Sequence, residues 1–455
     1  MQRFDAIVVG AGQAGPPLAG RLTAAGMTVA VVERKLVGGT CVNTGCIPTK
    51  TLVASAHAVH TARRGAEYGF GADDIAVDMA KVKARKDKVM LDDRYGVEAW
   101  LSGMPGCTLI RGHARFTGPK TMTVDDQTIE ADRIFLNVGG RAIVPDIPGL
   151  SDLDYLTNVG ILELDVVPEH LVIIGGSYIA LEFAQMYRRF GARVTVVEHG
   201  PRLTSREDED VSATIKEILE ADGIAVEVGA DAIRITKRDG GFELVARDGA
   251  QPIAGSHLLV ATGRRPNTDE LGLEAAGVET DEHGYIHVDD QLRTTVEGIW
   301  AMGDCNGRGA FTHTSYNDFE IVAANLLDDD PRRVSDRVPT YALYIDPPLG
   351  RAGLTVDQVR KSGRKALVGK RPMTRVGRAV EKGETQGFMK VVVDADTEQI
   401  LGAAVLGVGG DEVIHSILDV MTAKLPYTAI SRTMHIHPTV SELLPTLLQQ
   451  LKPMH

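Results

Sequence analysis

The chain opens with an alternation of apolar and polar segments that is typical of an α/β fold. A short apolar run, Ala6 to Val9, ends at a glycine-rich turn, and a stretch with a helical pattern follows as far as Leu22. A second apolar run covers Thr28 to Val32 and is followed at once by Glu33. This order of strand, glycine turn, helix, strand and acid predicts a dinucleotide-binding unit.

The same pattern returns in the stretch from His170 to Gly200. Gly175 lies 165 residues after Gly10, and Glu198 lies 165 residues after Glu33. The sequence therefore predicts two dinucleotide folds with the same internal spacing. Two such folds in one chain indicate two different dinucleotides, a flavin that is held permanently and a nicotinamide that comes and goes.

The glycines of the first turn have separate tasks. Gly10 permits the tight turn, Gly12 lets the backbone approach a pyrophosphate, and Gly15 lets the helix pack against the strand. The N-terminus of the helix then presents N–H groups to the phosphates. Glu33 is expected to accept hydrogen bonds from a ribose diol.

The second turn departs from this pattern at Ser177 and Ala180, which replace the middle and last glycines. Alanine is a permitted variant, and serine adds only a small side chain where the pyrophosphate approaches. Glu198 favours NADH over NADPH, because a carboxylate binds a free 2′-hydroxyl and repels a 2′-phosphate. Arg202 and Arg206 follow and could offset part of this repulsion, so NADPH stays the alternative.

The last part of the chain has a different pattern. The stretch from Gly387 to Gly407 predicts two strands joined by a polar turn, and Asp411 to Lys424 predicts an amphipathic helix. Pro426 lies just past the end of this helix. Its apolar positions are Val413, Ile414, Ile417, Val420 and Met421.

Composition restricts the class of protein. The 455 residues carry a net charge of −12 without a basic stripe, so neither nucleic acid nor an anionic membrane is an expected partner. The length suits two to four domains, and no apolar run is long enough to span a membrane. The N-terminal segment contains an aspartate where an export signal would be apolar, and four cysteines do not form a disulfide framework. We therefore expect a cytoplasmic protein.

Cys41 and Cys46 nevertheless lie only five positions apart. In a regular helix their Cα atoms would be separated by more than the ~7 Å that a disulfide allows. Bridging them needs a non-helical segment, which residues 43–45 permit, and Pro48 is accommodated in a first helical turn. The spacing predicts a helix that begins near Gly45 or Cys46, with a readily reduced disulfide at its start.

Other interpretations of these cysteines are weaker. Two ordinary packed cysteines are one alternative, and a zinc half-site is another, but no second Cys or His pair has matching spacing. We therefore predict no metal site. Cys107 and Cys305 are isolated, and we interpret them as small packed residues.

The segment "GGTCVNTGCIPTK", Gly38 to Lys50, closely resembles the redox signature of the class I pyridine nucleotide–disulfide oxidoreductases. This family includes dihydrolipoamide dehydrogenase, glutathione reductase and mercuric reductase. Further segments resemble family motifs in the family's order, namely "GRAIVPDIPG", "VATGRRPN", "IWAMGDCNG" and "HIHPTVSE". Asn137 and Val138 depart from the usual Ala-Thr of the family. The resemblance covers essentially the whole chain.

The resemblance implies roles for the catalytic residues. Cys41 would attack the substrate, and Cys46 would be the charge-transfer thiol beside the flavin. His437, oriented by Glu442, would protonate the leaving thiol, in agreement with the need of thiol–disulfide exchange for a proton donor near pH 7.

Further roles concern the two cofactors. Lys50 and Glu182 would form an ion pair near the flavin, and Tyr178 would cover the nicotinamide pocket and move aside for the cofactor. The resemblance implies that FAD is bound by Gly10, Gly12, Gly15, Glu33, Gly39, Thr40, Lys50, Gly303, Asp304, Phe311, Thr312 and His313. It implies that NAD(P) is bound by Gly175, Ser177, Tyr178, Ile179, Glu198 and Gly263.

The expected fold is α/β, with two Rossmann-like domains, for FAD and NAD(P), and a C-terminal α+β dimerisation domain. The first part of the FAD domain would span residues 1–145, the NAD(P) domain 146–269, the return to the FAD domain 270–335, and the interface domain 336–455. The resemblance also implies a homodimer in which His437 enters the partner's active site.

The expected function is a flavoenzyme that passes electrons from NAD(P)H through FAD to Cys41 and Cys46, and then to a small disulfide or a thiophilic metal ion, Hg(II) or Cu(II). The ending "LLQQLKPMH" lacks the extra cysteine pair of many mercuric reductases and of large thioredoxin reductases. Glutathione reductases usually have arginines where this chain has Glu198. One alternative is the dihydrolipoamide dehydrogenase subunit of a 2-oxoacid dehydrogenase complex. Another is a redox sensor without turnover, against which His437 argues.

Overall fold

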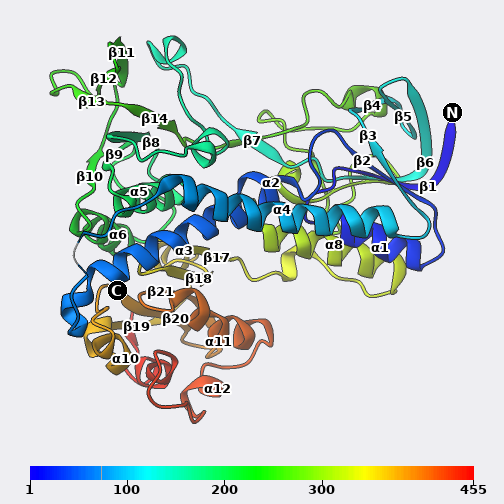
Figure 1. Cartoon of the computed structure of the whole chain (residues 1–455). Coiled ribbons are helices and arrows are strands. Elements are labelled where there is room, and N and C mark those ends of the chain that lie inside the picture. The colour runs from blue at the N-terminus through cyan, green and yellow to red at the C-terminus, as the bar shows by residue number, and fades with distance from the viewer. Residues whose placement is uncertain (73, 455) are drawn as a thin grey trace. The chain divides into compact units, whose positions relative to one another are not determined.

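The computed structural model describes residues 1–72 and 74–454 (Figure 1). The chain forms two compact units, each assembled from three separate segments. Unit 1 comprises Met1–Thr51, Lys83–Val144 and Gly263–Arg337, and unit 2 comprises Leu52–Val82, Pro145–Thr262 and the chain from Val338 onward. The four domain ranges expected from the sequence stay predictions.

A seven-stranded sheet forms the centre of unit 1, in the order β3-β2-β1-β6-β5-β4, with β16 paired to β6. Its strands are β1 (Gln2–Val9), β2 (Val29–Glu33), β3 (Cys107–Arg111), β4 (Ala114–Gly118), β5 (Thr121–Val124), β6 (Gln127–Leu136) and β16 (Ile299–Ala301). β1 is parallel to both β2 and β6, and β4 and β5 form an antiparallel extension. The two apolar runs at the start of the chain are therefore neighbouring buried strands, as predicted.

Helices of unit 1 are α1 (Gly15–Ala24), α2 (Gly39–Thr44), the major part of α4 (Met79–Gly103), α7 (Leu273–Ala276) and α8 (Thr312–Leu327). α1 and α8 lie side by side along the sheet (Figure 1), and their buried side chains belong to one apolar cluster. A short antiparallel pair, β7 (Gly140–Ala142) and β15 (Arg264–Pro266), joins distant segments of the same unit. These elements place the carboxyl ends of β1 and β6 beside the start of α1.

A second parallel sheet lies in unit 2, in the order β10-β9-β8-β14. Its elements are β8 (His170–Ile174), α5 (Tyr178–Phe190), β9 (Arg193–Glu198), α6 (Glu209–Ala221), β10 (Ala225–Val228) and β14 (His257–Val260), and a small antiparallel sheet consists of β11 (Arg234–Arg238), β12 (Gly241–Val245) and β13 (Ile253–Gly255). All five residues of β8 are buried, which is expected of a central parallel strand. The repeated strand–turn–helix–strand pattern is confirmed.

A six-stranded antiparallel sheet forms the C-terminal part of unit 2, in the order β17-β18-β21-β20-β19-β22. The strands are β17 (Thr340–Leu343), β18 (Leu349–Gly353), β19 (Ala366–Pro372), β20 (Phe388–Asp394), β21 (Ile400–Leu406) and β22 (Lys452–Pro453). α11 (Gly410–Thr422) buries Val413, Ile414 and Ile417 in the same apolar cluster as β20 and β21. The predicted strand pair and amphipathic helix are confirmed.

The remaining helices are α3 (Cys46–Arg63), α9 (Val356–Lys361), α10 (Gly377–Glu381), α12 (Thr428–Ser431) and α13 (Leu444–Leu448). Single 3₁₀ turns occur at Gly65–Tyr68, Leu150–Asp152, Gly160–Glu163, Gly303–Asn306, Val334–Asp336, Met373–Arg375 and Ser441–Leu443. Among the helices of residues 1–72 and 74–454, none combines the length and the apolar character that a bilayer crossing requires. The α/β class, with two Rossmann-like sheets and a C-terminal α+β part, is as predicted.

Candidate active site

The turn between β1 and α1 is a close-packed backbone cradle. Gly10 has φ +102°, and a Cβ atom there would lie 2.3 Å from the carbonyl oxygen of Asn137. A Cβ atom on Gly15 would lie 2.3 Å from the carbonyl oxygen of Gly10. Only glycine fits at either position. The turn therefore has the packing that the motif requires, and its contact with a pyrophosphate stays a prediction.

The segment that carries the cysteines packs against this cradle. Gly39 has φ +61°, and a Cβ atom there would lie 2.8 Å from the Cα atom of Gly12. The amide of Gly38 donates to Ala11 O at 2.8 Å, and Gln13 Nε2 donates to Gly38 O at 3.2 Å. The glycine turn and the redox segment therefore pack together, and Thr40 lies in the first turn of α2.

Glu33 lies at the end of β2 and forms a hydrogen bond with the glycine turn between β1 and α1. Its Oε2 accepts a hydrogen bond from the amide of Ala11 at 2.9 Å, and its Oε1 accepts one from the amide of Lys35 at 2.8 Å. Each carboxylate oxygen can accept a second hydrogen bond. Glu33 can thus stabilise the turn and still accept hydrogen bonds from a ribose diol.

Asn137 supplies a test of whether the site fits a dinucleotide. The residue follows β6 and is 6% exposed, and its Nδ2 makes no hydrogen bond within the described part of the chain. This atom lies 3.2 Å from the Cβ position of Gly12, and Asn137 Oδ1 lies 3.3 Å from that of Gly303. A buried donor without an acceptor costs free energy unless a ligand supplies the acceptor. The unmatched donor and the glycine cradle fit the diphosphate of FAD.

The segment with Gly303 and Asp304, which the resemblance assigns to FAD binding, lies at the same edge of the sheet. Gly303 begins the 3₁₀ turn that includes Asp304, and the amide of Gly303 donates to Asp318 Oδ2 at 2.7 Å. Asp304 Oδ2 accepts a hydrogen bond from Arg264 Nη2 at 3.0 Å. Gly303 and Asn137 thus lie next to the glycine turn in unit 1.

The two cysteines lie on either side of a break between helices. α2 ends at Thr44, Gly45 has φ −137° and ψ −116°, and α3 begins at Cys46. A Cβ atom at position 45 would lie 2.8 Å from the carbonyl oxygen of Thr40. The predicted helix start at Gly45 or Cys46 is confirmed, but the non-helical excursion is confined to Gly45 because Asn43 and Thr44 belong to α2.

Cys46 is also linked to the start of α8. Its Sγ lies 3.1 Å from the Oγ1 of Thr312, the first residue of α8, and the rings of Phe311 and His313 stack at 5.4 Å. The N-terminus of a long helix and a hydroxyl donor both stabilise a thiolate. The structure therefore brings Thr312, one of the residues expected to bind FAD, to the predicted charge-transfer thiol.

The pKa of Cys41 is raised well above that of an ordinary thiol. The largest cause is its hydrogen bond with Cys46, followed by burial and by the charge of Cys46, while Thr312 has the opposite effect. One negative charge on the pair is favourable and two are not, because the second thiolate would face the first. Ionisation of both thiols together is therefore unfavourable, and Cys41 is the one whose pKa is raised.

The second glycine turn, in unit 2, repeats the packing of the first. Gly175 has φ +121°, and a Cβ atom there would lie 2.4 Å from the carbonyl oxygen of Ala261. A Cβ atom on Gly176 would lie 2.7 Å from Glu198 Oε2, so the acid reaches the turn directly. The sequence motif did not single out Gly176. Ser177 is exposed at the N-cap of α5 and leaves the approach to the helix N-terminus open.

Glu198 and Arg202 make hydrogen bonds to different parts of the same loop, whereas the Arg206 side chain is exposed. Glu198 Oε1 accepts a hydrogen bond from the amide of Gly200 at 2.6 Å. Arg202 Nη2 donates to the carbonyl oxygens of Ser205 and Glu207, both at 3.1 Å. The Arg202 guanidinium therefore stabilises its own loop.

Tyr178 and Ile179 form the first turn of α5 and are half-buried. Burial raises the pKa of Tyr178, with a smaller opposing effect of a hydrogen bond with Tyr341. Glu182, one turn further along α5, is buried, and its Oε1 accepts from the amide of Tyr344 at 3.0 Å. Lys50 lies in α3 within unit 1, and its ion pair with Glu182 stays a prediction.

His437 and Glu442 form the predicted pair. The distance between His437 Nδ1 and Glu442 Oε2 is 2.9 Å, and the His437 side chain is 80% exposed. A carboxylate at Nδ1 favours the tautomer that presents Nε2 outward. Gly263 belongs to unit 1, where its carbonyl oxygen accepts from the amide of Ile143 at 3.0 Å. Its assignment to NAD(P) stays a prediction.

Two family models together match most of the chain. Residues 4–318 match the pyridine nucleotide-disulphide oxidoreductase model, and residues 339–448 match the dimerisation domain of the same family. The second match supports a homodimer. Proteins of this flavin-dependent family use FAD and NAD(P)H.

Named relatives span several activities. The chain is 37% identical to the Escherichia coli (strain K12) protein described as a probable pyridine nucleotide-disulfide oxidoreductase, RclA, over 99% of this chain and 100% of the relative. It is 35% identical to a Streptomyces lividans mercuric reductase over 97% of this chain and 94% of that protein. It is 34% identical to a Thermus scotoductus dihydrolipoyl dehydrogenase over 97% and 96%, respectively.

A solved structure is similar to this chain over its whole length. A Cu(II) complex of the HOCl-induced flavoprotein disulfide reductase RclA from Escherichia coli superposes with a TM-score of 0.90 at 35% identity, over 99% of both chains. The glycine cradles, the cysteine pair at a helix start and the matches over both parts of the chain lead to the same conclusion. The chain belongs to the pyridine nucleotide–disulphide oxidoreductase family and is a flavin-dependent enzyme of that family.

Proposed function

We propose that the chain is an NADH-dependent reductase of a small disulfide, with Cys41 and Cys46 as its redox pair. The observation that carries this proposal is the environment of the two thiols. Cys46 Sγ lies within hydrogen-bond distance of Thr312 Oγ1, at 3.1 Å, while the pKa of Cys41 is raised by its hydrogen bond with Cys46. A pair in which one thiol is deprotonated and the other keeps its proton is in the state that thiol–disulfide exchange requires.

In the proposed reaction Cys41 transfers its proton and its sulfur attacks one sulfur of the substrate disulfide. A mixed disulfide forms, and the first substrate thiol leaves with a proton. The Cys46 thiolate then attacks the sulfur of Cys41, which closes the Cys41–Cys46 disulfide and releases the second substrate sulfur as a thiolate that takes its proton from solvent. Two electrons leave the protein in this sequence. FAD, when bound, supplies the route by which NADH returns these two electrons.

His437 is proposed as the group that accepts the proton of Cys41 and returns it to the leaving thiol. Its contact with Glu442 at 2.9 Å fixes the ring orientation, and its high exposure suits a role in the partner subunit's active site. Exchange between thiols at neutral pH needs such a proton carrier, whereas electron transfer to a metal ion does not. This pair therefore favours a disulfide as the substrate.

The preference for NADH rests on Glu198 and Arg202. Glu198 reaches the glycine turn at Gly176, where the ribose of a dinucleotide would lie, and its negative charge opposes a 2′-phosphate. The Arg202 guanidinium is engaged by two carbonyl oxygens of its own loop. Arg202 is therefore less able to compensate for the repulsion between Glu198 and a 2′-phosphate.

A second candidate substrate is a thiophilic metal ion. The similar solved structure is described as a Cu(II) complex, and a similar curated protein is a mercuric reductase. A pair of adjacent thiols is a ligand set that suits soft metal ions. In this alternative the ion takes the electrons of the dithiol and no mixed disulfide forms.

The test is a substrate panel on the purified FAD-loaded dimer. Lipoamide, glutathione disulfide, Cu(II) and Hg(II) are each offered with NADH and with NADPH, and nicotinamide oxidation is followed. We expect turnover with a small disulfide and a higher kcat/KM for NADH. Turnover with metal ions alone would favour the second candidate, and no turnover with any acceptor would contradict both and favour a redox sensor. Co-purification with an acyltransferase would instead indicate a subunit of a 2-oxoacid dehydrogenase complex.

A further inference from the structure

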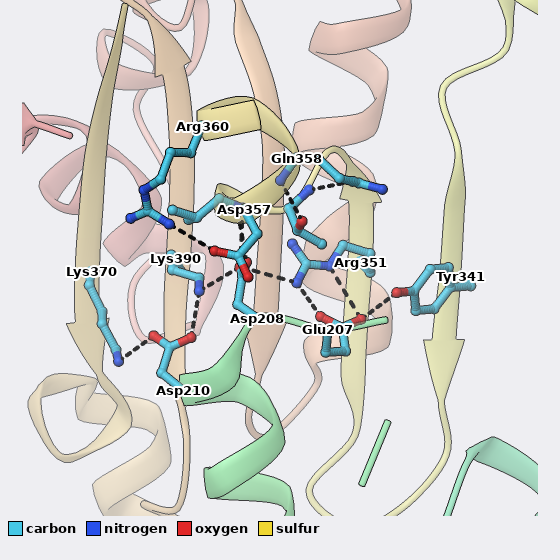
Figure 2. Close-up of polar contacts among 12 residues, drawn as sticks. Glu207, Asp208, Asp210, Tyr341, Arg351, Asp357, Gln358, Arg360, Lys370 and Lys390 are labelled. Atoms are coloured by element: carbon cyan, nitrogen blue, oxygen red, sulfur yellow. Dashed lines mark hydrogen bonds and ion pairs between the residues drawn. The ribbon is translucent and has the colours of Figure 1, made fainter. Parts of the chain in front are cut away.

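A buried ionic network ties the start of α6 to the C-terminal sheet within unit 2 (Figure 2). Glu207 accepts hydrogen bonds from Arg351 of β18. Lys390 of β20 contacts Asp208 at 2.7 Å and Asp210 at 2.6 Å. These contacts cross from the loop that follows Glu198 to strands more than a hundred residues away in the sequence.

Burial makes this network rigid. Glu207 is 1% exposed, Arg351 2%, and Lys390 4%. Removing either member of a buried ion pair leaves an uncompensated charge, so the remaining charges strongly favour a single arrangement. The position of the Glu207 carboxylate is therefore fixed by its contacts with the C-terminal sheet.

Tyr341 forms a hydrogen bond with the Glu207 carboxylate. It lies on β17, and its hydroxyl donates to Glu207 Oε1 (Figure 2). Burial, together with the charge of Glu207, raises the pKa of Tyr341, so the phenol keeps the proton that it donates. The position of its ring is thus set by a carboxylate that is itself held by Arg351.

The Tyr341 ring in turn contacts Tyr178. The two ring centroids are 5.3 Å apart with an interplanar angle of 60°, an edge-to-face arrangement. Tyr178 is the first residue of α5 and follows directly on the Gly175–Ser177 turn. A side chain at the nucleotide turn is consequently in contact with a residue that the ionic network immobilises.

We infer that Tyr341 is a positioning residue that restrains Tyr178 and thereby lowers the affinity for nicotinamide nucleotides. The inference rests on the proposed function, in which Tyr178 moves aside when the nicotinamide binds. Contacts that hold Tyr178 against Tyr341 must then be given up on binding, so the free energy of these contacts opposes the nucleotide. Neither tyrosine needs to take part in a chemical step.

The experiment measures the dissociation constant of NAD⁺ for the oxidised FAD-loaded dimer by calorimetry. Tyr341→Phe removes one hydroxyl and keeps the ring, and should lower the dissociation constant by about fivefold, the effect of one net hydrogen bond. Tyr341→Leu also removes the ring contact and should lower it further. FAD content and circular dichroism show whether each variant is folded.

Two controls make the result specific. Tyr187→Phe, in the same helix, removes a buried hydroxyl that donates to Ile161 O at 2.8 Å and should leave the NAD⁺ dissociation constant unchanged. In a Tyr178→Ala background, Tyr341→Phe should have no further effect, because the restrained ring is gone. A dissociation constant that is unchanged or raised in Tyr341→Phe, or the same shift in both backgrounds, would overturn the inference. Failure of the wild-type dimer to bind NAD⁺ or to oxidise NADH would instead overturn the proposed function.

Discussion

At the scale of single residues, the site depends on a few contacts that sequence position does not reveal. Cys46 contacts Thr312 across more than 260 positions of sequence, and Asn137 lies against Gly12. Both contacts bring together the ends of separate elements of unit 1. The chemistry assigned to each residue can therefore be tested by single substitutions.

Replacing Cys46 with serine tests which sulfur is next to the flavin. Two-electron reduction of the wild-type dimer should produce a long-wavelength absorbance that arises from a thiolate beside oxidised flavin. Cys46→Ser should abolish this band. Cys41→Ser has no disulfide to reduce and should show the band already in the oxidised dimer, because the Cys46 thiolate and its Thr312 contact remain. Absorbance during anaerobic titration with dithionite measures the band. Its survival in Cys46→Ser would assign the role to Cys41.

Replacing Asn137 tests its proposed contact with FAD. Asn137→Ala removes the buried Nδ2 donor, and we expect the dissociation constant of FAD to rise by about five- to tenfold. The apoprotein should be as stable as wild type or more stable, because an unmatched buried donor is removed. Asn137→Asp should weaken FAD binding more, since a carboxylate near a diphosphate is repelled. Flavin fluorescence and thermal unfolding report the two effects, and FAD affinity that is equal or higher in Asn137→Ala would contradict the assignment.

At the scale of elements, the strands, glycine turns and helices were predictable because their patterns are local. The apolar runs of β1 and β8, the helix start at Cys46 and the amphipathic face of α11 each follow from residues near in sequence. The network around Glu207 was not predictable, because Arg351 lies in a strand and carries no local sign that an acid 144 positions earlier will pair with it. Asn137 was visible as a departure from the family pattern, but its burial was not.

The ionic network also predicts a pH-dependent stability. Burial alone would raise the pKa of Asp208, but the hydrogen bond and charge of Lys390, with the charge of Arg351, hold it below its usual value. A lowered carboxylate pKa stabilises the fold above about pH 4, and this contribution is lost as the pH falls through the folded-state pKa. Lys390→Met should therefore cost about 3–5 kcal/mol at pH 7 and progressively less below about pH 4.

Urea denaturation of the FAD-loaded dimer at pH 7, 5 and 3.5 measures this difference. Lys370→Met is the matched control, because the Lys370 side chain contacts Asp210 at 2.7 Å but is 45% exposed, and it should cost less than about 1 kcal/mol. Equal losses in the two variants, or a Lys390→Met loss that does not vary with pH, would show that the buried network is not the source of the stability.

At the scale of the whole molecule, the C-terminal part of the chain exposes apolar side chains beside the predicted catalytic histidine, His437. Met434 is 95% exposed and Ile436 is 80% exposed, and both lie within three residues before His437. Exposed apolar side chains beside a predicted catalytic group are expected where a partner subunit covers them. This agrees with the dimerisation-domain match and with the proposed placement of His437 in the partner's site.

Mixing two impaired variants tests that placement. Dimers of Cys41→Ser should be inactive, and dimers of His437→Ala should turn over slowly with normal flavin reduction. A heterodimer would combine an intact Cys41 in one chain with an intact His437 in the other, so subunit exchange should restore activity to about a quarter of wild type. Steady-state assays before and after exchange measure the recovery. Without recovery after verified exchange, His437 would act within its own chain.

The junction between Arg206 and Glu207 has a practical consequence for protein engineering. Residues 198–206 include Glu198, Arg202 and Arg206, so this loop is the obvious segment to transplant from a relative in order to change the nucleotide preference. The next residues, Glu207 and Asp208, face Arg351 and Lys390 instead of solvent. A graft that ends at residue 206 should exchange cofactor preference alone. A graft that also replaces residues 207 and 208 would remove the ion pairs that hold this loop to the C-terminal strands. The resulting chimera would lose stability as well as its original cofactor preference.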